Sequence, residues 1–106
     1  MSSTWQPWIT LNRVTGTSML PTLRNGQIVL VSHRREPSEG DVVVAKHPTT
    51  GAAIIKRVVK IEADGFWLQG DAHNPATAAT SQDSWTFGPV QLSDISGTVV
   101  WPRKKP

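Results

Sequence analysis

The sequence predicts a small, mainly β domain: a coiled antiparallel β-sheet with little helix. Eight glycines and eight prolines are scattered along the 106 residues, and no window holds the i, i+3, i+4 apolar repeat of a long amphipathic helix. Short apolar runs alternate instead with polar turns, which is typical of closed or coiled antiparallel sheets. We expect a single domain over residues 1–106, with a small core and flexible ends at 1–7 and 103–106.

Six strands are expected, each bounded by turn residues. The pair Asp64-Gly65 is a strong hairpin signal between the fourth and fifth strands. Residues 70–84 form a loop of small polar residues that is long for so compact a chain, and such loops are usually functional or disordered. The expected strands are residues 8–14, 28–31, 41–45, 53–61, 66–69 and 95–101.

Charge and composition exclude several classes of function. The net charge of +3 is accounted for by the basic tail Arg103-Lys104-Lys105, so there is no basic face for nucleic acid. The tail is either simply solvated or attracted to an anionic membrane. The chain has no cysteine, and therefore no thiol nucleophile, disulfide or cysteine zinc site.

Targeting signals are also missing from the sequence. There is no run of about 18 apolar residues, so no transmembrane helix is expected. The N-terminus lacks the basic start and apolar run of a signal peptide. We therefore expect a cytoplasmic protein or one bound peripherally at a membrane. Trp5 and Trp8 either contact a lipid interface or a partner, or they cover one edge of the core.

The most informative stretch is Gly16-Thr-Ser18-Met-Leu-Pro21-Thr-Leu, with a strand-like run behind it. Gly16 allows an unusual backbone angle or a close approach by another segment, and Pro21 excludes most regular structure around it. Ser18 is therefore expected on a shaped loop or at a strand end. A nucleophile is held in such a place, but an ordinary structural serine is also common there.

A lysine in the middle of the longest strand is the second informative feature. Because side chains alternate along a strand, we expect Ile54, Lys56, Val58 and Lys60 on one face. Lys56 either extends its ammonium to water or is a partly buried amine whose charged form is disfavoured by desolvation. Lowering its pKa from about 10.4 to about 8 would make about a tenth of it neutral at pH 7. A neutral lysine can accept the proton of a serine hydroxyl.

The three histidines offer rival chemistry. His73 lies in the long loop near Asp83, which would allow a Ser18–His73–Asp83 triad, but no local motif supports it. His33, His47 and His73 lack the ligand spacing of a metal site. We therefore expect no metal and no other cofactor.

With Ser18 and Lys56 identified, the chain resembles the type I signal peptidases, which use a Ser/Lys dyad. The resemblance runs from about residue 14 to residue 102, and four boxes in family order are strong evidence. The fold it implies is the coiled β-sheet domain of signal peptidases and LexA-type proteins, in agreement with the strand pattern. The matching segments are Gly16-Thr-Ser18-Met-Leu-Pro-Thr-Leu, Gly40-Asp-Val-Val-Val, Ile55-Lys56-Arg-Val-Val, the last box of Gly70-Asp71, Ser81-Gln-Asp83-Ser and Phe87-Gly-Pro-Val, and the closing strand from Ile95-Ser-Gly to Trp101-Pro.

The resemblance also implies roles. Ser18 would be the nucleophile, Lys56 the general base, and Ser81, or alternatively Thr80, would orient the lysine amine. The main-chain N–H of Ser18 would contribute to the oxyanion hole, where Gly16 replaces a residue that supplies a hydroxyl in some members.

Further residues are implied as the surroundings of this dyad. Asp71 and Asp83 would be structural support near the site. The implied partner is a protein or peptide substrate with small residues before the cut, bound in extended form by β-augmentation. A membrane surface or a membrane-anchored partner is also implied, and nucleic acid is not. The expected substrate-binding residues are Arg13, Val14, Thr15, Met19, Ala53, Ile54 and Ile55.

Departures from the family pattern leave alternatives open. Trp85 stands where the family usually has arginine, and Ala72 replaces the usual asparagine. A degenerate β-module that binds peptides or a membrane surface is therefore a competing hypothesis, and a self-cleaving LexA-type protein is another. Without a large insertion after Lys56, the chain is also similar to the small maturation proteases of nickel superoxide dismutase and to the catalytic core of mitochondrial inner-membrane peptidases.

Overall fold

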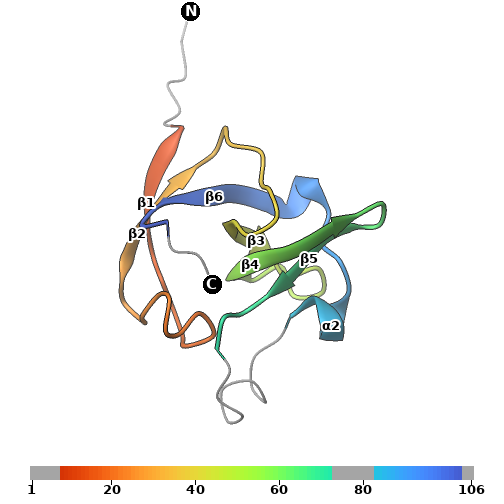
Figure 1. Cartoon of the computed structure of the whole chain (residues 1–106), viewed down its shortest axis with the longest axis horizontal. Coiled ribbons are helices and arrows are strands. Elements are labelled where there is room, and N and C mark those ends of the chain that lie inside the picture. Colours follow the sequence, from red (N-terminus) through yellow and green to blue (C-terminus); the bar gives the residue numbers. More distant parts are fainter. Residues whose placement is uncertain (1–7, 73–82, 104–106) are drawn as a thin grey trace, which may run out of the picture.

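The computed structural model describes residues 8–72 and 83–103, and these form one coiled antiparallel sheet of six strands (Figure 1). The strand order is β1-β2-β6-β3-β4-β5, so the last strand in sequence lies in the middle of the sheet. Every neighbouring pair is antiparallel. The strands are β1 (Ile9–Arg13), β2 (Ile28–Ser32), β3 (Val42–Lys46), β4 (Ala53–Glu62), β5 (Gly65–Gln69) and β6 (Ile95–Trp101).

The predicted fold class and all six predicted strands are confirmed, with small shifts at their ends. The hairpin between β4 and β5 is present, and because Glu62 pairs with Gly65, its loop consists of Ala63 and Asp64. Two short elements were not predicted: the helix α2 (Ser84–Phe87) and the 3-10 helix η1 (Leu92–Asp94). Both are too short to show a periodic apolar pattern in sequence.

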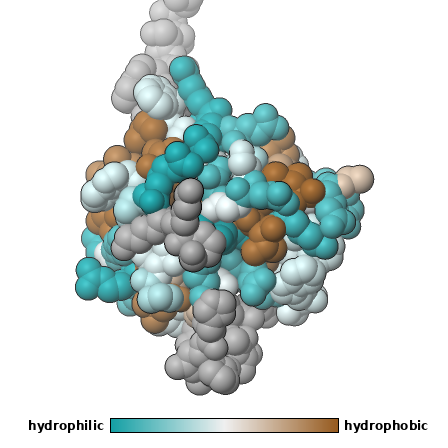
Figure 2. All heavy atoms as spheres, viewed as in Figure 1, coloured by the Kyte–Doolittle hydropathy of each residue, from teal (hydrophilic) through white to brown (hydrophobic). Residues whose placement is uncertain are grey.

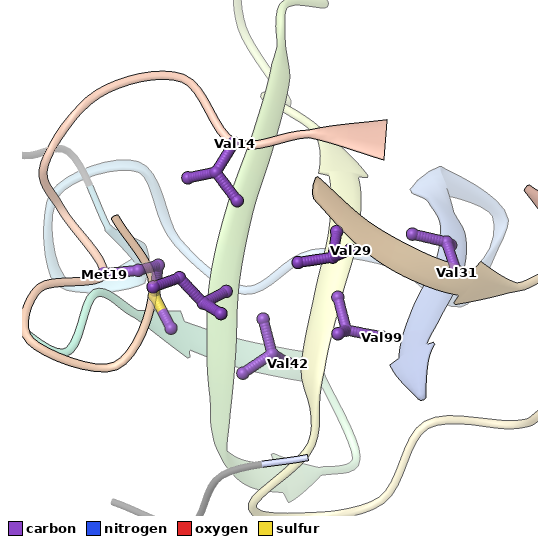
Figure 3. Close-up of a cluster of buried hydrophobic side chains, with 7 residues drawn as sticks. Val14, Met19, Val29, Val31, Val42 and Val99 are labelled. Atoms are coloured by element: carbon purple, nitrogen blue, oxygen red, sulfur yellow. The ribbon is translucent and has the colours of Figure 1, made fainter. Parts of the chain in front are cut away.

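The sheet coils so that β3 is buried on both faces. Successive side chains of a strand point to opposite faces, and Val42 and Val43 belong to two different apolar clusters. The first cluster lies under the loop between β1 and β2, and its side chains point toward one another in Figure 3. It contains Val14, Met19, Leu23, Val29, Val31, Val42 and Val99. The second contains Val43, Ala45, Val58, Phe66, Leu68 and Val90.

A bulge in β4 changes the alternation predicted for this strand. The pairing with β5 shifts between Val58 and Lys60, so that Val58 lies opposite Leu68 but Lys60 lies opposite Trp67. The prediction that Lys60 shares the face of Lys56 is therefore wrong, because the extra residue of a bulge turns the following side chains to the other face. The Lys60 ammonium lies 4.6 Å from the Trp67 ring centroid instead.

The surface is mixed rather than dominated by one kind of side chain. On the face drawn in Figure 2, apolar residues form separate groups among hydrophilic ones. Trp8, Leu11 and Trp101 are among the exposed large apolar residues. Within residues 8–72 and 83–103, no helix has the length and apolar character needed to cross a membrane.

Truncation of the second cluster tests this packing. Leu68 is fully buried, so Leu68→Ala is expected to lower the free energy of unfolding by about 2–5 kcal/mol. Leu92 is 49% exposed, and the same substitution there is expected to cost no more than about 0.5 kcal/mol. Urea unfolding of both variants measures the difference. Equal losses would contradict the burial assigned to β5.

Candidate active site

Ser18 lies in the loop between β1 and β2, which is held from both ends. The Val14 N–H donates to the Gln27 carbonyl (2.8 Å), and the Leu23 N–H donates to the Met19 carbonyl (2.9 Å). Met19 and Leu23 are anchored in the first apolar cluster. Ser18 itself is half-buried beside the buried Met19, so the loop fixes its backbone while leaving the side chain accessible.

Lys56 lies in the middle of β4 opposite Val43, and only 4% of its surface is exposed. This burial lowers the pKa of Lys56 below the ordinary lysine value, since the ammonium loses its hydration. The negative charge of Asp83 acts in the opposite direction and raises the pKa. The prediction from sequence left open whether Lys56 extends to water, and the structure favours the buried amine.

The two residues line one open groove of about 540 Å³. Ser18 enters it from the loop after β1, and Lys56 from β4, so the fold brings together two segments that are far apart in sequence. The other lining residues are Asn12, Arg13, Thr15, Gly16, Thr17, Val44, His47, Thr50, Ala52, Ala53, Ile54 and Ile55.

A buried ion pair ties these segments to each other. Arg57 donates from Nε to Asp71 Oδ1 (2.8 Å) and from Nη2 to Asp71 Oδ2 (2.6 Å), and from Nη1 to the Gly40 carbonyl (2.6 Å). The Thr22 hydroxyl donates to the same Asp71 carboxylate at 2.5 Å. Asp71 therefore joins the loop that carries Ser18 to the strand that carries Lys56.

A close backbone contact reinforces this link. The Ala72 N–H donates to the Ser18 carbonyl at 2.9 Å. A Cβ atom on Gly70 would lie 2.4 Å from the Ser18 carbonyl oxygen, so only glycine permits the approach. Gly70 and Asp71 thus contact the Ser18 loop directly and β4 through Arg57. The supporting role of Asp71 in the site stays a prediction.

Five of the seven residues predicted to bind substrate line the groove, and two do not. Arg13, Thr15 and the segment 53–55 are among its walls. The side chains of Val14 and Met19 are buried in the first cluster. The main chain of Val14 is also engaged, since its carbonyl accepts the Gly26 N–H at 2.7 Å.

The two groups predicted for the oxyanion hole differ in their surroundings. The Gly16 N–H donates to the Asn25 side-chain oxygen at 2.9 Å, so it is already bonded, and its φ of +91° explains the glycine. Within residues 8–72 and 83–103, the Ser18 N–H has no hydrogen-bond acceptor. Ser18 is thus the better placed of the two donors, and both assignments stay predictions.

Three predicted residues, Ser81, Thr80 and His73, lie outside the described residues, so the lysine-orienting group stays a prediction. Asp83 is the N-cap of α2, where its carboxylate accepts the Trp85 N–H at 3.1 Å.

The two described histidines are hydrogen-bonded parts of the fold. His33 contacts the Thr10 hydroxyl and the Ser96 carbonyl. His47 lines the groove, and its Nδ1 accepts the N–H groups of Thr49 (3.1 Å) and Thr50 (3.2 Å). With Nδ1 engaged in this way, His47 shapes the turn at the end of the groove.

Sequence reasoning missed Arg57 and Thr22, the partners of Asp71. One signal was available: two adjacent cations in an apolar strand must point to opposite faces, and a buried arginine requires a carboxylate.

The fold is thus a coiled antiparallel sheet in which a half-buried serine and a buried lysine line one groove. The family described as Peptidase S24-like matches residues 6–88, which include Ser18, Lys56 and Asp71. The chain belongs to this family. No curated protein matches it. The family supports the predicted relationship to LexA-type and signal peptidase-type domains at the level of the fold, whereas removal of a signal peptide stays a prediction.

Loss of the Asp71 charge tests the link across the groove. Asp71→Asn leaves the buried Arg57 without its counter-charge and is expected to lower the free energy of unfolding by about 3–5 kcal/mol. The matched control is Glu62→Gln. Glu62 also pairs with a cation of β4, Lys60, but the side chains of this pair are 36% (Lys60) and 52% (Glu62) exposed. The control is expected to cost less than about 1 kcal/mol. If guanidinium unfolding gives similar losses of unfolding free energy for both variants, the Arg57–Asp71 pair stabilises the fold no more than an exposed ion pair does.

Proposed function

We propose that the protein is a serine endopeptidase in which Ser18 is the nucleophile and Lys56 the general base. The observation that carries the proposal is that the half-buried Ser18 and the buried Lys56 line the same groove. Desolvation lowers the pKa of Lys56, which increases the share of neutral amine able to act as a base.

The chemistry follows from these two groups. Neutral Lys56 accepts the Ser18 hydroxyl proton as Oγ attacks the substrate carbonyl carbon, and the carbonyl oxygen becomes an oxyanion near the Ser18 N–H. The lysine ammonium then donates its proton to the leaving amine as the peptide bond breaks. In the second half, Lys56 takes a proton from water, hydroxide attacks the acyl ester, and the proton returns to Ser18.

The backbone supports an extended substrate between β1 and β4. Alternate residues of an antiparallel strand direct their N–H and C=O groups to opposite sides. Since Val14 bonds to Gln27 and Gly26, the groups of Arg13 and Thr15 face the other side. On β4, the N–H and C=O groups of Ala53 and Ile55 face away from β3. The pairing of β4 with β5 begins only at Arg57, so β5 does not bond to these groups.

The proposed substrate is a protein from which an N-terminal signal or propeptide is removed, as in signal peptidases. Small side chains before the cut fit a groove whose walls include Thr15, Ala52 and Ala53. A membrane surface or membrane-anchored partner, and action in the cytoplasm or peripherally at a membrane, belong to the same proposal through the signal peptidase resemblance.

Two alternatives have specific motives. A degenerate β-module that binds peptides is motivated by Trp85, which stands where the signal peptidase pattern has an arginine. A self-cleaving LexA-type protein is motivated by the Peptidase S24-like match.

Covalent labelling separates an active dyad from a binding module. A serine-reactive acyl probe is expected to modify the wild type at Ser18, to leave Ser18→Ala unlabelled, and to react about 10²–10⁴-fold more slowly with Lys56→Ala. Ser93→Ala and Lys46→Ala, which remove an exposed serine and an exposed lysine that do not line the groove, are the controls and should label normally. Labelling is located by mass spectrometry, with circular dichroism as the test of folding. An unlabelled wild type, or full labelling of Lys56→Ala, would contradict the proposal.

The pH dependence of labelling is a second test. Only neutral Lys56 accepts the serine proton, so the rate is expected to rise with pH as the lysine loses its own proton. Burial lowers the pKa of Lys56, so the midpoint of this rise should lie below the free-lysine value of about 10.4. Below that midpoint the rate should fall about tenfold per pH unit. A rate that is independent of pH, or a midpoint at or above the free-lysine value, would argue against a buried lysine base.

A further inference from the structure

The short helix α2 is attached to three consecutive residues of β5, Trp67, Leu68 and Gln69. The buried Ser84 hydroxyl accepts the Leu68 N–H at 2.8 Å. The Trp85 indole N–H donates to the Gln69 side-chain oxygen at 3.0 Å, and its ring lies 4.9 Å from that of Trp67. A helix of four residues has too few internal hydrogen bonds to be stable alone, so these contacts determine where it sits.

The helix in turn fixes Asp83. The Asp83 carbonyl accepts the N–H groups of Thr86 (2.9 Å) and Phe87 (3.0 Å), and its carboxylate accepts the Trp85 N–H (3.1 Å). The Phe87 ring lies 4.6 Å from that of His47, a wall of the groove.

On the sheet, Leu68 and Gln69 lie opposite Val58 and Arg57, the residues that follow Lys56. The contacts of Ser84 and Trp85 with Leu68 and Gln69 therefore bring Asp83, the residue before α2, to the part of β4 that carries Lys56. In keeping with this, the charge of Asp83 raises the pKa of Lys56.

Trp85 contributes more to this attachment than a surface residue would. Although it is 57% exposed, its ring contacts Trp67 and lies 5.3 Å from the Lys60 ammonium, which sits over both indoles. The bulge in β4 turns Lys60 to this side. The side chains of Lys60, Trp67 and Trp85 together form a stacked group that attaches α2 to β5.

We propose that Trp85 is a positioning residue for the general base: its ring anchors α2 on β5 and so holds the Asp83 carboxylate beside Lys56. Its catalytic meaning rests on the proposed function of the Ser/Lys pair. Trp85 stands where the signal peptidase pattern has an arginine, and it would then keep Asp83 in place by aromatic stacking instead of by an ion pair.

The charged and titratable groups around Lys56 in the described residues determine the direction in which its pKa changes when the Asp83 charge is removed. The charge of Asp83 acts on Lys56 from the N-cap of α2, and His47, which follows β3, lines the same groove. Arg57, the next residue on β4, is bound to Asp71. Lys60, beyond the bulge, pairs with Glu62 at 3.0 Å. Removing the Asp83 charge leaves the desolvation of Lys56 without this opposing carboxylate, so Lys56 should lose its proton at lower pH.

The test is an NMR titration of the Lys56 side chain, which does not depend on activity. Asp83→Asn is expected to shift the Lys56 midpoint to lower pH, and Trp85→Ala to shift it the same way. The double variant should shift no further than Asp83→Asn alone, because Trp85 acts through Asp83. Trp85→Phe, which keeps a ring against Trp67, should restore most of the wild-type midpoint.

Trp101→Ala is the matched control, since Trp101 is 61% exposed and lies at the end of β6 that pairs with β2. It should leave the midpoint unchanged. An unchanged midpoint in Trp85→Ala, or shifts that add in the double variant, would overturn the proposal. Gln69→Ala provides a second way to loosen Trp85 if Trp85→Ala does not fold. If the midpoints behave as expected but the wild type is not labelled at Ser18, the proposed peptidase function fails while the positioning role of Trp85 stands.

Discussion

The buried ion pair between Arg57 and Asp71 is the interaction on which the arrangement of the groove depends. It joins β4 to the segment after β5, and Thr22 attaches the Ser18 loop to the same carboxylate. A pair removed from water is stable only when its remaining hydrogen-bonding groups are also satisfied. The Gly40 carbonyl accepts a further Arg57 donor, and no buried side-chain nitrogen or oxygen in the described part of the chain lacks a partner.

Two adjacent cations on β4 are handled in opposite ways. Neighbouring residues of a strand point to opposite faces, so Arg57 reaches Asp71 while Lys56 lines the groove. Arginine stays charged in any protein environment and requires a carboxylate when buried, whereas a buried lysine loses its proton more readily. The order Lys-Arg therefore places one cation in the buried ion pair and the other in the wall of the groove.

The features that could be predicted from sequence are those with local signals. Apolar runs between turn residues located all six strands, and the family-like boxes indicated Ser18 and Lys56. Contacts between distant segments are harder to predict. The adjacent cations Lys56 and Arg57 indicate that a carboxylate partner is needed, but Thr22 and Arg57 meet at Asp71 only in the folded sheet. The bulge after Val58 depends on pairing with β5, and α2 owes its place to tertiary contacts with Leu68 and Trp67.

The proposed Ser18–Lys56 dyad is tested most directly by a crystal structure of the protein acylated by a serine-reactive inhibitor. The acyl group is expected on Ser18, with Lys56 Nζ within hydrogen-bond reach of its Oγ, about 2.6–3.2 Å. Asp71 is expected still to bridge Arg57 and Thr22 in this state. An inhibitor bound to another residue, or a Lys56 side chain directed away from Ser18 into solvent, would contradict the dyad.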